Sequence, residues 1–178
     1  MSKIKLFYSG VYACWHSEIT PDNIREKLKN DVRAKLVDNI DSVLYYSNEG
    51  VYTKNPNVQY MGGFYYEPYR GGMPTTESVV LAELEEIGRS DVVVVNLLGE
   101  NAIASITELI YAAQLKKRIE VFVEDTPDAF DVTGKYWFPI GTAKIIHPWS
   151  VWEKVEGVTI HRVKSNQEVI DFILNLKE

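Results

Sequence analysis

The sequence predicts an α/β protein in which helices flank both faces of a doubly wound, mostly parallel sheet. The clearest sign is the uninterrupted apolar run Val92–Val95, because a strand that is apolar on both faces is typical of a parallel sheet covered by helices. A second sign is that β-rich segments alternate with segments of helical periodicity. The third is size, because 178 residues with 46% hydrophobic content suffice for a single compact domain over residues 1–178.

The first quarter of the chain predicts a strand, a helix and a second strand. Ile4–Tyr8 is rich in β-forming residues and ends before a Ser-Gly pair. Thr20 and Pro21 have the pattern of an N-cap followed by the first helical residue. An apolar stripe with a spacing of four then predicts one helix: Ile24, Leu28, Val32, Leu36 and Ile40. Val43–Tyr46 is the next strand candidate.

Residues 48–75 predict no regular structure, since glycine and proline interrupt the segment repeatedly. The same segment is rich in aromatic side chains, which a plain connection does not need: Tyr60, Phe64, Tyr65, Tyr66 and Tyr69. These aromatics predict either a wall against which a base stacks or a subunit interface. Thr76–Gly88 then predicts a helix, whose apolar side consists of Val79, Val80, Leu84 and Ile87.

The second half of the chain continues the alternation. Asp91–Leu98 is predicted to be the central strand, Ser105–Lys117 a helix and Ile119–Val123 a further strand. A long loop over residues 124–142 precedes two short extended segments and a closing helix: Lys144–Ile146, Val158–Val163 and Gln167–Leu176. This order of elements indicates a flavodoxin- or Rossmann-like domain, in which ligands bind outside the carboxyl ends of the strands.

Charge and cysteine content argue against several classes of protein. Lys and Arg number 19 against 25 for Asp and Glu, so the net charge is −6 and a nucleic-acid backbone would be repelled. No apolar run approaches the length of a membrane span, and the first residues lack the pattern of a signal peptide. Cys14 is the only cysteine, which excludes an intrachain disulfide and favours a cytoplasmic protein.

Common nucleotide-binding and hydrolase motifs are missing from the chain. There is no glycine-rich dinucleotide fingerprint after the first strand, no P-loop and no nucleophile elbow. His16, His147 and His161 are scattered and lack the spacing of metal ligands. We therefore expect a site that works without a cofactor or a metal.

One carboxylate has the sequence context of a nucleophile. The central strand leads into a polar loop, and Glu108 follows in the first turn of the next predicted helix. The partial positive charge at a helix start favours an ionised carboxylate, which can attack an electrophilic carbon. Polar residues and glycine at the strand ends, or beside Glu108, complete the predicted site: Ser9, Gly10, Asn96, Asn101 and Ser105.

Taken together, these segments resemble the nucleoside 2-deoxyribosyltransferase family. Members of that family end the first strand with a tyrosine and a glycine, as Tyr8-Ser9-Gly10 does here. They carry a carboxylate on the helix before the central strand, which Glu83 resembles. Their Glu-Leu-Gly-Tyr-Ala helix start is similar to the segment that begins at Glu108, and the loop over the base is similar to residues 60–65.

The resemblance implies that the protein exchanges nucleobases on 2-deoxyribose through a covalent glutamyl-deoxyribosyl intermediate. Glu108 would attack the anomeric carbon, Tyr8 would orient its carboxylate by a hydrogen bond, and Glu83 would assist the departing base. Asn101 or Glu100 would replace a family aspartate that is missing before the nucleophile. The resemblance further implies a nucleoside and a free nucleobase as partners, and a homo-oligomer. The expected base-covering residues are Gly63, Phe64 and Tyr65.

Structural roles are open for the same residues. Ser105-x-x-Glu108 is also the pattern of a capping box, and this pattern recurs at Ser165-x-x-Glu168. Tyr8 has the character of a core strand aromatic, and Glu83 lies in an acidic run typical of a solvated helix face. Two other functions also fit: an N-glycoside hydrolase of nucleosides or nucleoside monophosphates, and a non-catalytic nucleotide-sensing module.

Overall fold

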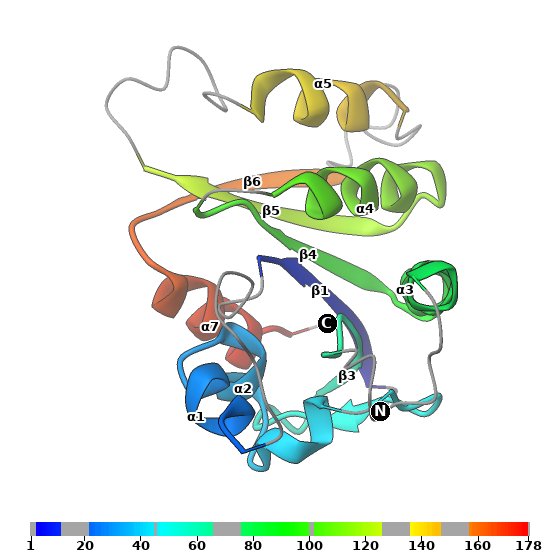
Figure 1. Cartoon of the computed structure of the whole chain (residues 1–178). Helices are drawn as coiled ribbons and strands as arrows, with labels where there is room; N and C mark the ends of the chain where they lie inside the picture. The colour runs from blue at the N-terminus through cyan, green and yellow to red at the C-terminus, as the bar shows by residue number, and fades with distance from the viewer. Residues whose placement is uncertain are drawn as a thin grey trace.

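A computed structural model of the protein describes residues 3–11, 22–44, 46–65, 76–99, 102–125, 136–146 and 157–177. Within these ranges, six strands form one sheet that has helices on both faces (Figure 1). The predicted α/β fold class is therefore confirmed.

The sheet is mostly parallel and has the strand order of a flavodoxin-like protein. Its strands are β1 Ile4–Gly10, β2 Val51–Tyr52, β3 Val58–Gly62, β4 Val92–Asn96, β5 Arg118–Glu124 and β6 Val158–Val163. They lie in the order β2-β3-β1-β4-β5-β6, and only the edge pair β2–β3 is antiparallel. Without β2, the five parallel strands are ordered second, first, third, fourth and fifth, which is the flavodoxin-like arrangement.

The helices form two layers on opposite faces of the sheet (Figure 1). One layer consists of α1 Ile24–Leu28, α2 Val32–Leu36, the short 3-10 helix η1 Ile40–Val43 and α7 Asn166–Leu174. The other layer consists of α3 Thr76–Arg89, α4 Ile103–Gln114 and α5 Trp137–Ile146. A separate cluster of buried apolar side chains fills the space between the sheet and each layer.

Alternate residues of the central strands contribute to different clusters, because successive side chains of a strand point to opposite faces. Tyr8 and Val94 pair in register and lie in the cluster beneath α1, α2 and α7. Phe7 and Val93 pair one residue earlier and lie in the cluster beneath α3, α4 and α5. All four side chains are buried, which explains why the central apolar run has no polar interruption.

The chain changes sides of the sheet between β1 and β4. It leaves β1 towards α1 and α2 on one face, and it leaves β4 towards α4 on the other face. In open α/β sheets, ligands bind at the carboxyl ends of the strands at such a switch point. Ser9 and Gly10 end β1 at this place, and Asn96 ends β4 in register with Gly10.

The helix predicted over Ile24–Ile40 is divided into shorter segments. α1 ends at Leu28, and α2 begins after Asp31, whose extended backbone and side chain cap the second helix. The stripe with a spacing of four is nevertheless buried from Ile24 to Leu36, because both helices present the same side to the sheet. The predicted N-cap at residues 20 and 21 lies outside the described residues.

Two strand predictions are wrong, the strands β2 and β3 were missed, and the loop predicted over residues 124–142 contains the first part of α5. Val43 ends η1 instead of starting a strand at Val43–Tyr46, and Lys144–Ile146 forms the last turn of α5. The actual neighbour of β1 is β3, within the segment for which the sequence predicts no regular structure. Its five residues follow a turn that contains Pro56 and end at Gly62, so glycine and proline conceal a short buried strand.

The other predicted strands and helices are confirmed, with small differences at their ends. Within α3, however, Val80 is 46% exposed, although its spacing of four to Leu84 places it on the same side of the helix. No helix in the described ranges has the length and apolar content to cross a membrane.

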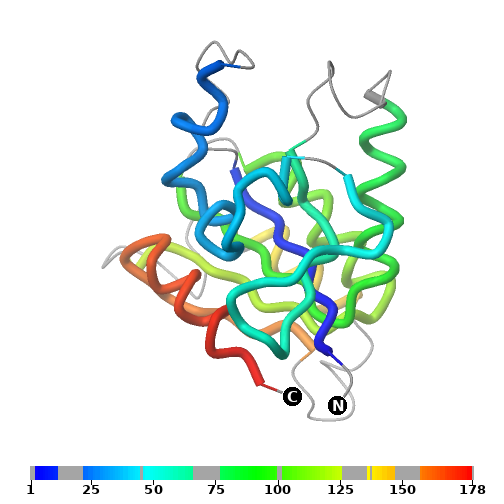
Figure 2. The backbone as a smooth tube through the Cα atoms, turned by 90° about the horizontal axis from the view of Figure 1, so that it is seen from below, coloured from blue at the N-terminus to red at the C-terminus, as the bar shows by residue number. Residues whose placement is uncertain are grey.

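The two ends of the described chain lie at the same side of the molecule (Figure 2). The turn at Asn55–Asn57 joins them: Ile4 donates its N–H to the Asn57 carbonyl at 2.8 Å. The Asn55 amide donates to the carbonyls of Ile173 and Leu176 at 3.3 and 3.0 Å. This side is the amino edge of the parallel strands, so the candidate site at the opposite, carboxyl edge is separate from both ends.

Candidate functional site

The carboxylate that the sequence predicts to be nucleophilic bonds across to the first strand. Glu108 is half-buried in the second turn of α4. The Ser9 hydroxyl at the end of β1 donates a hydrogen bond to its Oε2 atom. Among the described residues, none hydrogen-bonds the other oxygen, Oε1. The sheet therefore positions one carboxylate oxygen and leaves the second without a protein partner there.

The capping-box alternative for Glu108 is wrong. α4 begins at Ile103, and its N-cap is Ala102, which makes no side-chain cap hydrogen bond. Ser105 is buried inside the first turn, where it cannot act as the N-cap. Glu108 is consequently too far along the helix to bond the free N–H groups at its start.

The matching pattern on α7 does contribute to a helix start. Ser165 is the N-cap residue of α7 by position, although its hydroxyl makes no cap hydrogen bond. Glu168 reaches back and accepts a 2.8 Å hydrogen bond from the backbone N–H of Lys164. The same spacing of Ser and Glu thus stabilises one helix start and connects the other helix to a strand.

Three effects act on the pKa of Glu108. Burial is the largest, and it raises the pKa above its usual range. The Ser9 hydrogen bond and the positive charge of Arg33 act in the opposite direction, because both favour the ionised carboxylate. The net effect is a raised pKa, so the carboxylate is a stronger base than an ordinary surface glutamate.

Tyr8 does not orient Glu108, because its side chain lies on the opposite face of the sheet from α4. Its hydroxyl accepts a 2.8 Å hydrogen bond from the Asn96 amide, and its ring lies 4.8 Å from the Arg33 guanidinium carbon. Burial raises the pKa of the phenol well above its usual range. The predicted hydrogen bond from Tyr8 is wrong, and the next residue, Ser9, makes it instead, since neighbours on a strand face opposite ways.

Asn96 also has a structural role. Its amide nitrogen donates to Tyr8 and to the Asn166 side-chain oxygen, both at 2.8 Å. Its own side-chain oxygen accepts from the backbone N–H of Leu98 at 3.0 Å. Because its donors and its acceptor are occupied and the side chain is buried, Asn96 connects β1, β4 and the start of α7 instead of presenting its amide to a ligand.

A buried arginine is the main feature that sequence reasoning missed. Arg33 on α2 is 2% exposed, and it donates to the carbonyls of Gly10 at 2.8 Å and Gly63 at 2.6 Å. It also donates to the Asp31 carboxylate at 3.3 Å. In the sequence, nothing distinguishes Arg33 from nearby cations such as Lys35, which is exposed. Only the packing of α2 against the ends of β1 and β3 identifies it.

Gly63 closes the end of β3 by a conformation that other residues rarely adopt. Its φ is +81°, and a side chain there would overlap the Tyr8 carbonyl oxygen. Its carbonyl accepts from the Tyr60 hydroxyl at 2.7 Å, and its N–H donates to the Glu86 carboxylate at 3.1 Å. The prediction that this glycine contacts the base is not tested by these contacts, which show a role in shaping the strand end.

The aromatic residues that follow are part of the core. Phe64 and Tyr65 are buried. Phe64 packs edge-to-face on Tyr60 and Tyr46, with ring centroids 5.3 and 6.3 Å apart. The expected base-stacking wall is therefore wrong for Phe64 and Tyr65, because both rings fill the space between the sheet and the helices. Tyr66, Tyr69 and the predicted contact Asn101 lie outside the described residues.

Two glutamates of α3 lie near this edge of the sheet. Glu86, which sequence reasoning passed over, is fully buried and bonds Gly63. Glu83 is half-buried and lies one turn earlier, on the same side of the helix, since residues three apart share a face. α3 starts after β3 and runs back towards the start of β4, so Glu83 lies nearer the carboxyl edge than Glu86 does.

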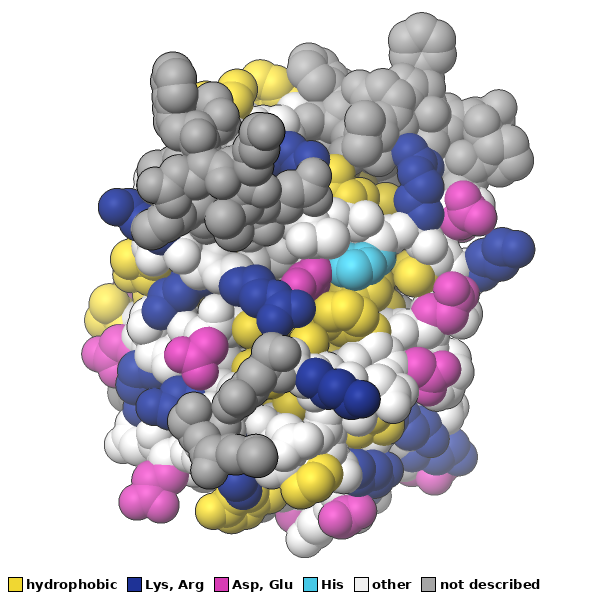
Figure 3. All heavy atoms as spheres, turned by 180° about the vertical axis from the view of Figure 1, so that it is seen from behind, with side chains coloured by type: hydrophobic (Ala, Val, Ile, Leu, Met, Phe, Trp, Pro, Cys, Tyr) yellow, Lys and Arg dark blue, Asp and Glu magenta, His cyan; other side chains and the backbone are white. Residues whose placement is uncertain are grey.

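A second carboxylate cluster lies on β5 and β6, and we refer to Arg118, Glu120 and His161 as the Glu120 cluster. Glu120 is 3% exposed; Arg118 bonds its Oε1 and His161 its Oε2, each at 2.7 Å. The His161 ring stacks on Phe122 at 4.6 Å and lies 4.9 Å from Phe172. Figure 3 shows the face opposite to the view of Figure 1, where a histidine is exposed among hydrophobic, acidic and basic side chains.

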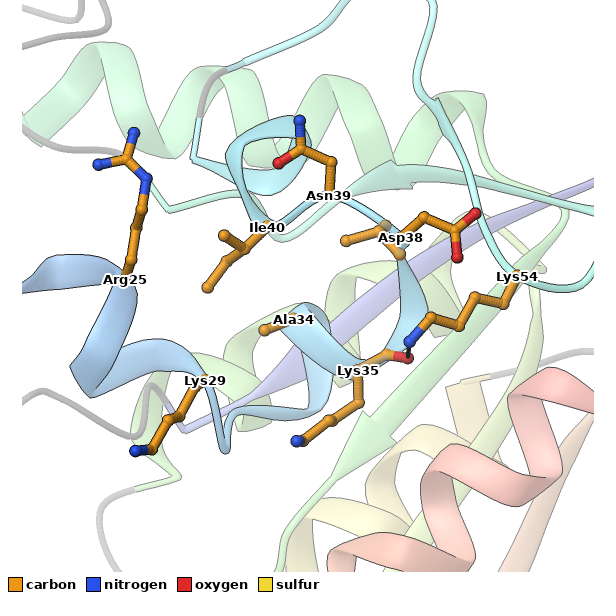
Figure 4. Close-up of a pocket in the computed structure, with 9 residues that line it drawn as sticks. Arg25, Lys29, Ala34, Lys35, Asp38, Asn39, Ile40 and Lys54 are labelled. Atoms are coloured by element: carbon orange, nitrogen blue, oxygen red, sulfur yellow. Dashed lines mark hydrogen bonds between the residues drawn. The ribbon is translucent and has the colours of Figure 1, made fainter.

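A surface cavity of about 400 Å³ lies against α1, α2 and η1, and none of the predicted site residues lines it (Figure 4). Four cations border it: Arg25, Lys29, Lys35 and Lys54. Arg25 forms an ion pair with Asp41 at 2.7 Å, and Lys54 donates to the carbonyl of Lys35 at 2.9 Å. Much of the donor capacity around this cavity is therefore used within the protein.

Neither metal-binding groups in the described residues nor similarity to known proteins identifies the reaction. In the part of the chain that the structure describes, no group of three His, Cys, Asp or Glu side chains could hold a metal ion. No protein-family model and no curated protein matches the chain. Among solved structures, it is similar to a conserved protein from Enterococcus faecalis V583, with a TM-score of 0.50 and 12% identity over 97% of this chain and 98% of that chain. This likeness supports the α/β fold.

Proposed function

We propose that the protein transfers 2-deoxyribose between nucleobases, with Glu108 as the nucleophile. The observation that carries this proposal is the hydrogen bond from Ser9 to Glu108, because it fixes a half-buried carboxylate at the switch point of the sheet. A glutamate that merely stabilised its own helix would lie at the helix start, as Glu168 does. The motifs shared with nucleoside 2-deoxyribosyltransferases give the substrate class.

The reaction is a double displacement at the anomeric carbon of the sugar. In the first step, a carboxylate oxygen of Glu108 forms a bond to that carbon while the bond to the base nitrogen breaks, and the base leaves after protonation. In the second step, a nitrogen of another base attacks the same carbon, the ester bond to Glu108 breaks, and the attacking base loses a proton. Configuration is retained, and no cofactor is consumed.

The neighbouring residues have distinct roles in this proposal. Ser9 holds Oε2 and so aims Oε1, which is the attacking oxygen. Glu83 is the candidate acid for the departing base, because it lies one turn nearer the carboxyl edge than Glu86, which bonds Gly63 at the end of β3. The partners are a deoxynucleoside and a free nucleobase, and the homo-oligomer implied by the family resemblance is a prediction that light scattering can check.

The test is a base-exchange assay on the whole chain. The protein is incubated with a deoxynucleoside, with and without a second free base, and the products are separated by chromatography. We expect exchange that requires the second base. Mass spectrometry without acceptor should detect a deoxyribosyl adduct on the peptide that contains Glu108.

Glu108→Gln and Glu120→Gln form a matched pair for this assay. Each removes one half-buried or buried carboxylate, but only Glu108 lies at the proposed site. Exchange lost in the first variant and kept in the second supports the proposal. Sugar release without a second base indicates the hydrolase alternative, and the absence of both reactions with every deoxynucleoside tried contradicts an enzymatic role.

A further inference from the structure

We propose that Arg33 is a positioning residue for the site at Glu108, acting by fixing the carboxyl ends of β1 and β3 through the carbonyls of Gly10 and Gly63. This inference rests on the proposed function where it concerns catalysis. It goes beyond that proposal because Arg33 is buried and comes from the helix layer on the opposite face of the sheet from α4. The Arg33 side chain thus acts on the site from the face of the sheet opposite to α4.

The geometry of Arg33 fits a clamp between two strand ends. Nη2 donates to the Gly10 carbonyl at 2.8 Å, and Nε donates to the Gly63 carbonyl at 2.6 Å. Both carbonyls belong to residues at the carboxyl ends of neighbouring parallel strands. A planar guanidinium can bond both at fixed angles, whereas the single nitrogen of a lysine cannot reproduce this pattern.

The clamp reaches Glu108 through one residue. Gly10 follows Ser9 directly, and the Ser9 hydroxyl holds the Glu108 carboxylate. A shift of the Gly10 carbonyl would therefore move Ser9 and change the aim of the carboxylate. Small misplacements of reacting groups reduce rates strongly, because the attacking atom must lie close to the carbon in a narrow range of directions.

Aromatic rings and a carboxylate hold the guanidinium in place. Its central carbon lies 4.8 Å from the Tyr8 ring centroid and 5.4 Å from that of Tyr65. Asp31 bonds Nη1 at 3.3 Å and also caps α2 by accepting from the Arg33 N–H at 2.9 Å. The arrangement explains why Tyr8 and Tyr65 are buried beside a charge, and it supplies a positive charge that favours ionised Glu108.

The test follows the ionisation of Glu108 and the rate of exchange separately. Glu108 is titrated by carbon-13 NMR of side-chain-labelled glutamate, with Glu108→Gln to assign its signal. We expect the pKa of Glu108 to rise in Arg33→Met, which removes the charge. Lys35→Met is the matched control, because it removes an exposed charge from the same helix and should leave the titration unchanged.

Exchange kinetics provide the second readout. Arg33→Lys keeps the charge but not the fork of donors, so kcat/KM should fall about 10–100-fold, as expected for lost orientation worth one or two hydrogen bonds. The acidic limb of the pH profile should stay in place in Arg33→Lys and move to higher pH in Arg33→Met. A merely structural substitution would lower the amount of folded enzyme without moving this limb.

Each outcome decides the inference. If Arg33→Met does not fold, the activity of Arg33→Lys still tests it. An unchanged Glu108 titration in Arg33→Met, or full activity in Arg33→Lys, would overturn the positioning role. If the wild-type protein has no exchange activity, the proposed function fails, whereas the NMR titration still reports whether Arg33 acts on Glu108.

Discussion

Glu108 on α4 and Glu120 on β5 differ in the residues that hydrogen-bond their carboxylates. Glu108 has one neutral hydroxyl partner, Ser9, and its pKa is raised because burial outweighs that bond and the charge of Arg33. Burial also raises the pKa of Glu120, yet the net pKa is lowered, since Arg118 and His161 bond its two oxygens. The hydrogen-bonding partners of a carboxylate, and not its burial alone, therefore decide whether it is held ionised.

The same difference separates a reactive group from a structural one. Both oxygens of Glu120 are engaged, one by the Arg118 guanidinium and the other by the His161 ring, so the carboxylate is satisfied within the fold. Glu108 keeps one oxygen without a described partner, and its raised pKa makes the ionised form more basic. The fold stabilises the ionised form of such a carboxylate less, but this form is better suited to attack an electrophilic carbon.

The sharpest test of the comparison is Glu108→Gln. We expect exchange activity to fall at least several hundred-fold, because loss of a nucleophile typically costs that much or more. The stability of the folded protein should increase in this variant, whereas its activity falls. Because folding raises the pKa of Glu108, the folded state binds more protons, and the wild type loses stability as the pH rises from 4.5 through the raised value. Above that window Glu108→Gln should melt at a higher temperature than the wild type; a lower melting temperature there would contradict the raised pKa.

Glu120→Gln should show the reverse behaviour. Removing the charge weakens two charge-assisted hydrogen bonds, so we expect a loss of about 1–3 kcal/mol in the free energy of unfolding with activity per folded molecule retained. Folding lowers the pKa of Glu120, so its contribution is present above pH 4.5 and disappears as the pH falls through the folded value. Urea unfolding at several pH values measures this, and the variant should converge with the wild type in acid.

Ser9→Ala tests the single hydrogen bond that distinguishes Glu108. We expect kcat/KM to fall about 10–100-fold, since one orienting hydrogen bond is lost. The pKa of Glu108 should rise further, because Ser9 favours its ionised form. The pH dependence of kcat/KM measures both effects. Ser9→Thr restores the hydroxyl and serves as the control, and a wild-type profile in Ser9→Ala would remove Ser9 from the site.

The smallest expected effect is that of Tyr8→Phe. The hydroxyl bonds Asn96 on the face of the sheet opposite to Glu108, so we expect a loss of about 1 kcal/mol in stability and less than about a threefold change in activity. Thermal melting and the exchange assay measure the two quantities. A loss of activity as large as that of Ser9→Ala would show that the phenol contacts the substrate after all.

The most regular apolar patterns of the sequence predicted the central strand β4 and the buried side of α1 and α2. The four valines of β4 and the stripe from Ile24 to Leu36 are buried as expected, because apolar periodicity reflects which face meets the sheet. The short strand β3 was not predictable, since its five residues lie among glycine and proline and owe their pairing to β1. Likewise, the end of α1 at Leu28 depends on Asp31 starting a new helix.

At the site, local sequence patterns indicate that a glutamate follows the central strand and that a Ser-Gly pair ends the first strand. Tertiary structure alone decided which of two neighbours, Tyr8 or Ser9, meets Glu108, because strand pairing sets the face to which each points. It also decided that Arg33 is buried at the strand ends while Lys35 is exposed. Local patterns encode helices and strands, whereas the environment of a charge depends on residues distant in the chain.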